Sequence, residues 1–171
     1  MTHAAKVARS GRIWCASTGS RVCASSKIAL HLRNRRLASM KRIDHIGIAV
    51  RDLHEAEKVF TDVLGVGPFK KESVDDESVQ VSFFQAGESK VELLESTTED
   101  GPIARHIEKR GEGLHHVAFH VDDLDAELKR LEELGYRIVS GPKSGADNKT
   151  IAFLHPADAN KVLVELCADS A

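Results

Sequence analysis

Residues 45–53, HIGIAVRDL, recur 71 positions further along the chain as HVAFHVDDL, residues 116–124. Two shorter matches follow in the same order, LG at 64–65 and 134–135, and VEL at 91–93 and 164–166. Matches at a nearly constant spacing indicate a duplicated structural unit, here of roughly 55 to 60 residues. The chain from residue 40 onward is therefore predicted to contain two copies of one unit.

The first unit is predicted to be a strand, a helix and three further strands. Residues 42–50 alternate as a strand, and Asp52 with Glu55 predicts the start of a helix. That helix is expected to end at Gly65, with an apolar face of Leu53, Ala56, Phe60, Val63 and Leu64. Strands are expected near 68–74, 79–86 and 89–95.

The second unit follows the same plan. Residues 114–121 predict a strand, and Asp123 predicts the start of a helix with Leu124, Leu128, Leu131 and Leu134 on its apolar face. Strands are expected near 136–140, 149–154 and 161–167, and a short helix near 101–110 connects the units. The predicted fold class is α+β, with βαβββ modules at about 42–96 and 113–168 in one domain, residues 40–171.

The formal net charge of −2 is a sum over two unlike parts of the 171-residue chain. Residues 1–39 hold eight basic residues and no acidic one, whereas residues 40–171 carry the other 16 basic and all 26 acidic residues, a net charge of −10. A net acidic domain argues against nucleic acid as a partner, because phosphate backbones attract basic surfaces. No apolar run approaches the roughly 20 residues of a membrane-spanning helix, so no membrane partner is expected.

Residues 1–39 are rich in Ser, Ala and Arg, lack helical or strand periodicity, and are predicted to be disordered. Two origins fit this segment. A mitochondrial transit peptide has this Arg-rich, acid-poor composition, and the mature protein would then lie in the mitochondrial matrix. Alternatively, Met40 is the true start, the segment is not native, and the protein is cytoplasmic. Neither origin gives the segment a part in the chemistry.

Cysteine usage and glycine motifs exclude further classes. Cys15, Cys23 and Cys167 are odd in number and lack zinc-site spacing, which indicates a reducing compartment without a disulfide framework. The chain contains neither the dinucleotide-binding glycine pattern nor a P-loop.

The first histidine of each repeat has a small neighbour on its own face of the strand. Side chains alternate along a strand, so His45 shares a face with Gly47, and His116 shares one with Ala118 and His120. The larger apolar residues occupy the other face, which must lie under the helices. His45 and His116 are therefore expected to point into open space on the opposite face.

Glu92 and Glu165 lie in the middle of apolar strands, where a carboxylate is costly to bury unless it is paired or bound to a metal. If the units pair about a pseudo-two-fold axis, the concave face receives one histidine and one glutamate from each. We predict that His45, Glu92, His116 and Glu165 ligate a divalent metal with two positions left open. Donors without thiolate favour Co, Mn, Ni, Zn or Mg, with Co or Mn preferred.

The other histidines are expected to have ordinary roles. His115 should face away from the side of His116 and either cap the strand or support His116 from behind. His120 is expected to be a satisfied core or rim residue, His155 to lie in the turn before the last strand, and His54 and His106 to lie on helix surfaces.

These features together resemble the vicinal-oxygen-chelate (glyoxalase/bleomycin resistance/dioxygenase) superfamily. Within it the sequence is most similar to the methylmalonyl-CoA epimerase family. The resemblance is carried by DHIGIAV at 44–50, VELLE at 91–95, GPIA at 101–104, GLHHVAF at 113–119, FLHP at 153–156 and VLVEL at 162–166.

The resemblance implies a bowl-shaped mixed sheet of paired modules, a homodimer, and epimerisation at C2 of the CoA thioester methylmalonyl-CoA. It implies the same four metal ligands, with Glu165 also acting as catalytic base. Some members carry a second glutamate on the strand at 79–83, where this chain has none, so a water, Ser82 or a residue of the turn at 75–77 would act instead. Candidates to meet the CoA phosphates are Lys143, Lys149 and Lys161.

Two alternative functions are compatible with the same predicted fold. A glyoxalase I-like lactoylglutathione lyase would use the same two histidines and two glutamates. A non-catalytic small-molecule-binding protein would have no need of metal ligands, so the predicted ligand set counts against it. An extradiol dioxygenase fits less well, because its iron site uses two histidines and one carboxylate.

Overall fold

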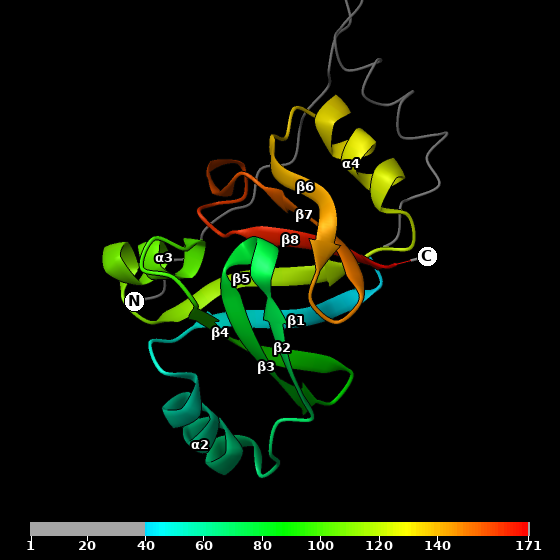
Figure 1. Ribbon diagram of the computed structural model, residues 1–171. Coiled ribbons are helices and arrows are strands. Elements are labelled where there is room, and N and C mark those ends of the chain that lie inside the picture. Colours follow the sequence, from blue (N-terminus) through cyan, green and yellow to red (C-terminus); the bar gives the residue numbers. More distant parts are fainter. Residues whose placement is uncertain (1–39, 171) are drawn as a thin grey trace, which may run out of the picture. The chain divides into compact units, whose positions relative to one another are not determined.

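The central element of the protein is a single eight-stranded sheet (Figure 1). The computed structural model describes residues 40–170, so the predictions about residues 1–39 lie outside the described residues. The strands are β1 (Arg42–Ala49), β2 (Lys70–Val74), β3 (Val79–Ala86), β4 (Ser89–Ser96), β5 (Gly113–His120), β6 (Ile138–Gly145), β7 (Lys149–Leu154) and β8 (Val164–Asp169). The helices are α2 (Leu53–Leu64), α3 (Pro102–Arg110) and α4 (Leu124–Glu133), and short 3-10 turns are η1 (Asp75–Glu77) and η2 (Pro156–Asp158).

The strand order reflects the internal repeat. It runs β2-β3-β4-β1-β5-β8-β7-β6, so the second half repeats the first in reverse order. Within each module the first and last strands are parallel, and β1 pairs with β5 in the antiparallel direction to join the two modules. The predicted α+β fold, two βαβββ modules in one bowl-shaped mixed sheet, is confirmed.

Two helices cover the outer face of the sheet. α2 packs Leu53 and Phe60 against Phe84 and Leu93, and α4 packs its own leucines against the strands of the second module. The Asp52 carboxylate accepts from the Glu55 backbone N–H, so the predicted cap of α2 is present. The Asp123 carboxylate caps α4 in the same way, accepting from the Ala126 backbone N–H.

The predicted apolar faces of both helices were one residue too wide. Val63 is 71% exposed and Leu134 is 52% exposed, because each lies near the end of its helix, where the surface turns away from the sheet. A charged residue is buried instead: Glu57 of α2 pairs with Lys71 on β2.

Two strand boundaries also differ from the prediction. β6 continues to Gly145 because residues 143–145 pair with β7 across a tight hairpin. β8 begins at Val164 rather than at 161. Asn160 and Lys161 have positive φ angles of 53° and 68°, which end a turn and are incompatible with a strand.

The sheet curls around a concave interior that α3 and the β6–β7 hairpin partly close. α3 packs Ile103 and Ile107 against the inner side of β3 and β4. At the hairpin tip, the Asp147 backbone N–H donates to Glu72 Oε2 over 3.1 Å, and Lys70 Nζ donates to the Asp147 carboxylate over 3.1 Å. The two edges of the sheet therefore meet through hydrogen bonds that involve both side chains and backbone. None of the helices within residues 40–170 has the length and apolar character needed to span a membrane.

Candidate metal and active site

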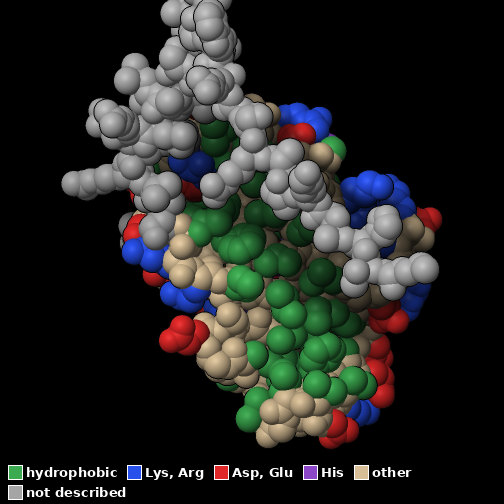
Figure 2. All heavy atoms as spheres, turned by 180° about the vertical axis from the view of Figure 1, so that it is seen from behind, with side chains coloured by type: hydrophobic (Ala, Val, Ile, Leu, Met, Phe, Trp, Pro, Cys, Tyr) green, Lys and Arg blue, Asp and Glu red, His purple; other side chains and the backbone are tan. Residues whose placement is uncertain are grey.

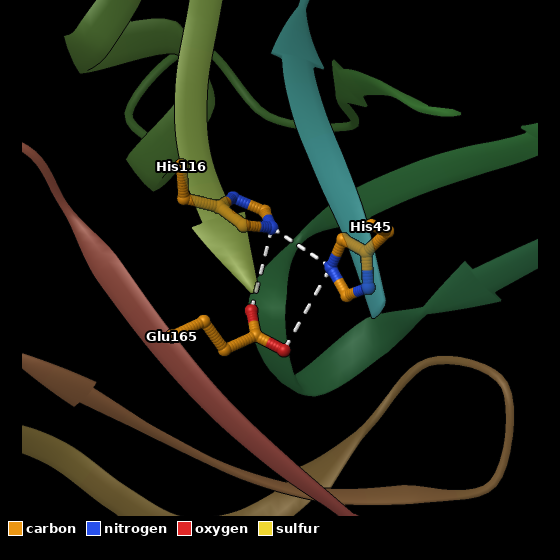
Figure 3. Close-up of side chains that lie close together, drawn as sticks. All are labelled: His45, His116 and Glu165. Carbon is orange, nitrogen blue, oxygen red and sulfur yellow. Dashed lines mark hydrogen bonds and ion pairs between the residues drawn. The ribbon is translucent and has the colours of Figure 1, made fainter. Parts of the chain in front are cut away.

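The two repeat-related histidines meet at the junction of the modules. His116 on β5 lies opposite Gly47 on β1, and His45 on β1 lies opposite Ala118 on β5. Their Nε2 atoms are 3.0 Å apart (Figure 3). A methyl group on Gly47 would lie 2.2 Å from His116 Cε1, so the ring occupies the space that the missing side chain leaves.

The two glutamates reach the same point from the flanking strands. Glu92 on β4 lies opposite Gly47, and its Oε2 is 3.3 Å from His45 Nε2 and 3.4 Å from His116 Nε2. Glu165 on β8 lies opposite Ala118, with its two carboxylate oxygens 3.4 Å from His116 Nε2 and 3.8 Å from His45 Nε2. The structure thus brings together all four side chains predicted as ligands.

The donor set fits a divalent cation. His45, His116 and Glu165 each offer a ligand atom, and these three atoms lie within 4.8 Å of one another. Glu92 adds a second carboxylate beside both imidazoles, and all four side chains are buried. Imidazole and carboxylate donors of this kind suit Mn, Co, Ni or Zn, and no thiolate is present among them.

The electrostatics of the set favour positive charge at its centre. Burial opposes ionisation of Glu92, but hydrogen bonds with His116 and His45 hold the pKa of this carboxyl well below its usual range. Burial also opposes protonation of His45, yet hydrogen bonds with Asp44 and Glu92 raise its pKa to about 10. For Glu165, burial outweighs the neighbouring imidazoles and raises the pKa above that of an ordinary glutamate.

Each histidine is preceded by a side chain that contacts its Nδ1 atom. Asp44 Oδ1 lies 3.1 Å from His45 Nδ1, and His115 Nδ1 lies 2.9 Å from His116 Nδ1. The prediction that His115 faces away from the side of His116 was wrong, since both line the same cavity. The ladder between β1 and β5 shifts register beside Asp44 and beside His115, which breaks the simple alternation.

His106 also departs from its predicted role as an ordinary surface residue. It is half-buried on α3, and its ring lies edge-to-face against His115 with centroids 4.7 Å apart. Burial, with smaller contributions from the neighbouring His116 and His106 rings, lowers the pKa of His115 to about 3. His115 is therefore neutral at physiological pH.

An apolar cavity extends from the four side chains toward α3 and the β6–β7 hairpin. Its walls include Val81, Leu94, Ile103, Ile151 and Phe153. Glu77 of η1 lines the same cavity and pairs with Lys143 on β6 over 2.6 Å.

Some of the residues predicted to be the second acid–base group or to contact CoA lie away from the cavity. Ser82 lies opposite Leu93, on the outer face under α2, so it does not reach the cavity. Lys149 is buried and pairs with Asp169, so it does not lie at the mouth, whereas Lys161 is exposed. Glu77 belongs to the predicted turn at 75–77, but no periodicity in the sequence indicated which of its residues would face inward.

The remaining histidines are not in the cluster. His155 accepts from the Ala157 backbone N–H in the predicted turn, and His54 is exposed as predicted. His120 is buried, but it is not satisfied as expected: neither ring nitrogen has a hydrogen-bond partner among residues 40–170, although Asp169 lies 3.4 Å away.

The sequence and structure match known proteins over most of the described part. Residues 44–153 match the model of the Glyoxalase/Bleomycin resistance protein/Dioxygenase superfamily. The chain is 39% identical over 128 residues to an ethylmalonyl-CoA/methylmalonyl-CoA epimerase of Cereibacter sphaeroides, covering 73% of this chain and 96% of that protein. It is 35% identical over 149 residues to the mitochondrial methylmalonyl-CoA epimerase of Bos taurus, covering 86% of this chain and 85% of that protein.

A solved structure gives the same match in three dimensions. It is a methylmalonyl-CoA epimerase of Streptomyces coelicolor in complex with 2-nitronate-propionyl-CoA, with a TM-score of 0.73 and 34% sequence identity. The match covers 78% of this chain and 97% of that one.

Proposed function

Because the chain belongs to the glyoxalase/bleomycin resistance protein/dioxygenase superfamily, we propose that it is an isomerase that inverts C2 of methylmalonyl-CoA with the help of a divalent metal. Relatives named as methylmalonyl-CoA epimerases support the reaction. A related epimerase bound to a CoA thioester analogue supports the substrate class.

The observation that carries the proposal is the convergence of two histidines and two glutamates at one end of an apolar cavity. His45, His116, Glu92 and Glu165 would hold the metal, for which Co or Mn is our preference. When bound, the metal supplies a Lewis acid that stabilises the negative charge developing on the thioester oxygen as the C2 proton leaves.

Inversion at C2 requires one group that removes a proton from one face and another that returns a proton to the opposite face. We assign the first role to Glu165, whose raised pKa suits a carboxylate that both accepts and releases a proton. We assign the second role to Glu77, because it is a carboxylate lining the same cavity from the other module. Lys143 holds Glu77 in place through its ion pair.

Deuterium wash-in at C2, followed separately from each C2 epimer of methylmalonyl-CoA, tests this assignment. With Co or Mn, the wild type should exchange and interconvert both epimers. Glu165→Gln and Glu77→Gln should each lower interconversion by about 10²–10⁴-fold, the usual contribution of an acid–base group. Each variant should still exchange the epimer whose C2 proton faces the remaining carboxylate.

The matched control is Asp76→Asn, which changes an exposed carboxylate in the same turn as Glu77 and should leave turnover intact. Absence of exchange in the wild type with either metal would overturn the epimerase proposal. Formation of S-lactoylglutathione by the same metal-loaded protein would instead favour the lyase alternative.

We also propose that the protein forms a homodimer through the outer face of β1 and β5. Between α2 and α4, the outward side chains of these strands are apolar and incompletely covered: Ile43 is 45% exposed and Leu114 is 59% exposed. Figure 2, which views the protein from behind, shows hydrophobic side chains gathered over a broad area of this side. Exposed apolar areas of this kind often mark contacts between proteins.

A further inference from the structure

We propose that Asp44 and His115 are positioning residues that fix the ring tautomers of His45 and His116, so that each Nε2 atom presents a lone pair to the metal. The inference rests on the metal site proposed above. Asp44 and His115 each precede a predicted ligand in the sequence and lie 71 positions apart. The same arrangement of a positioning residue and a ligand therefore occurs in each module.

Both residues lie at register shifts in the ladder between β1 and β5. The pairing passes from Ile43 to His45 without a partner for Asp44. On the other strand it passes from Leu114 to His116 without a partner for His115. An extra residue at such a bulge can turn its side chain toward the face of its neighbour. This explains how two consecutive residues both reach the concave side.

Asp44 serves His45. Its Oδ1 atom is 3.1 Å from His45 Nδ1, and a carboxylate can only accept, so Nδ1 carries the hydrogen. Lys90 Nζ lies 3.0 Å from the same oxygen and holds the carboxylate in its charged form. In the neutral ring, the form that can bind a metal, the lone pair of His45 is then left on Nε2, the atom that faces His116 and the glutamates.

The surrounding ion pairs explain the burial of Asp44 only in part, because Arg42 donates to its other oxygen, Oδ2, over a long 3.4 Å. The side chain is 1% exposed, and burying a carboxylate is costly unless it is needed there. Lys90 already pairs with Asp147 over 2.8 Å, and Lys149 already pairs with Asp169. His45 Nδ1 has no other hydrogen-bond partner among the described residues, so it is the group that depends on Asp44.

His115 serves His116 with a neutral acceptor. The two Nδ1 atoms are 2.9 Å apart, so one must donate and the other accept. If Nε2 of His116 binds the proposed metal beside the glutamates, that atom carries no hydrogen, so Nδ1 carries one and donates to His115. His115 then carries its own hydrogen on Nε2, and its ring is steadied edge-to-face against His106. A charged acceptor makes a stronger bond than a neutral one, so the loss of Asp44 should matter more than the loss of His115.

Metal affinity, measured by titration calorimetry with Mn(II) and with Zn(II), tests the roles. Asp44→Asn keeps the shape and an acceptor but removes the charge. It should weaken metal binding about 10- to 100-fold, the usual effect of losing a residue that hydrogen-bonds to a metal ligand. His115→Leu removes the acceptor and should weaken binding about fivefold to tenfold. His115→Asn restores an acceptor oxygen near the position of Nδ1 and should recover binding to within about threefold of wild type.

The control is Asp147→Asn, which removes a carboxylate from the same Lys90 but does not contact His45. It should bind metal to within about threefold of wild type, since only a general charge effect would lower its affinity. Equal losses in Asp147→Asn and Asp44→Asn would overturn the positioning role of Asp44.

A second measurement needs no variant. Long-range proton–nitrogen NMR spectra of the Zn-loaded wild type, labelled with ¹⁵N-histidine, should show zinc on Nε2 and hydrogen on Nδ1 of both His45 and His116. Zinc on Nδ1 of either ring would overturn the inference. A wild type that binds metal and catalyses exchange, with Asp44→Asn and His115→Leu binding as tightly, would refute the positioning roles alone. A wild type that binds no metal would overturn the proposed function as well.

Discussion

At the residue scale, Gly47 is the residue that lets the two histidines meet. A methyl group there would lie 2.2 Å from His116 Cε1 and 2.5 Å from His116 Nδ1, well inside contact distance. Gly47→Ala should therefore displace the His116 ring, lower metal affinity at least about tenfold, and destabilise the fold by about 1–3 kcal/mol through overpacking. Titration with Mn(II) and urea denaturation measure the two effects.

Gly67→Ala is the matched control, because a methyl group at this position would have no neighbouring atom within 4 Å among the described residues, and the backbone there is not in the left-handed region. It should leave both metal affinity and stability close to wild type. A Gly47→Ala protein that binds Mn(II) normally would show that the ring does not depend on this space.

The four predicted ligands could be identified from sequence because duplication placed them in pairs, each on an apolar strand with a regular alternation. Asp44 and the orientation of His115 could not, since a bulge depends on the pairing between strands and leaves no periodic trace in either one. Glu77 could not be singled out within its predicted turn for a related reason. In a turn, no alternation indicates which side chain points inward.

Acidification should reveal the contribution of a single ion pair. Hydrogen bonds from the Arg137 side chain and backbone lower the pKa of Asp158 to about 2. The unfolded state therefore binds a proton first as the pH falls, so this stabilisation is complete above about pH 4 and is lost as the pH approaches 2. Asp158→Asn should flatten the fall in the free energy of unfolding between these values, measured by urea denaturation at several pH values. A slope unchanged by the substitution would contradict this account.

At the scale of elements, the N-terminal caps fix where α2 and α4 begin on the outer face of the sheet. Asp52→Ala and Asp123→Ala each remove an acceptor for a free backbone N–H, and each should cost about 1 kcal/mol in urea denaturation. Asp62→Ala, an exposed change near the carboxyl end of α2, should be neutral or slightly stabilising, because a negative charge there opposes the helix dipole. Equal losses at all three positions would argue against capping.

These helix starts could be predicted because capping is local and depends on residues a few positions apart. Strand ends were less predictable. β6 is extended by pairing across its hairpin, and β8 is shortened by left-handed residues at 160 and 161. Neither effect is contained in the alternation of the strand itself.

At the scale of the whole described domain, the outer face of β1 and β5 should decide the oligomeric state. Ile43→Lys and Leu114→Lys place charges on this face and should shift the wild-type dimer toward monomer in sedimentation velocity measurements. Val139→Lys changes an equally exposed residue on β6, near the edge of the sheet, and should leave the dimer intact. A monomeric wild type at micromolar concentration would contradict the proposed interface.

The reversed strand order of the two modules has a consequence for stereochemistry. Each module supplies one histidine and one glutamate to the centre, and under our proposal each also supplies one of the two proton-transferring carboxylates, Glu77 from the first and Glu165 from the second. A planar intermediate held between them would present one face of C2 to each half of the duplicated protein. Under this proposal, two modules related by rotation approach C2 from opposite faces, and the divergence of the two copies lets the two approaches be adjusted separately.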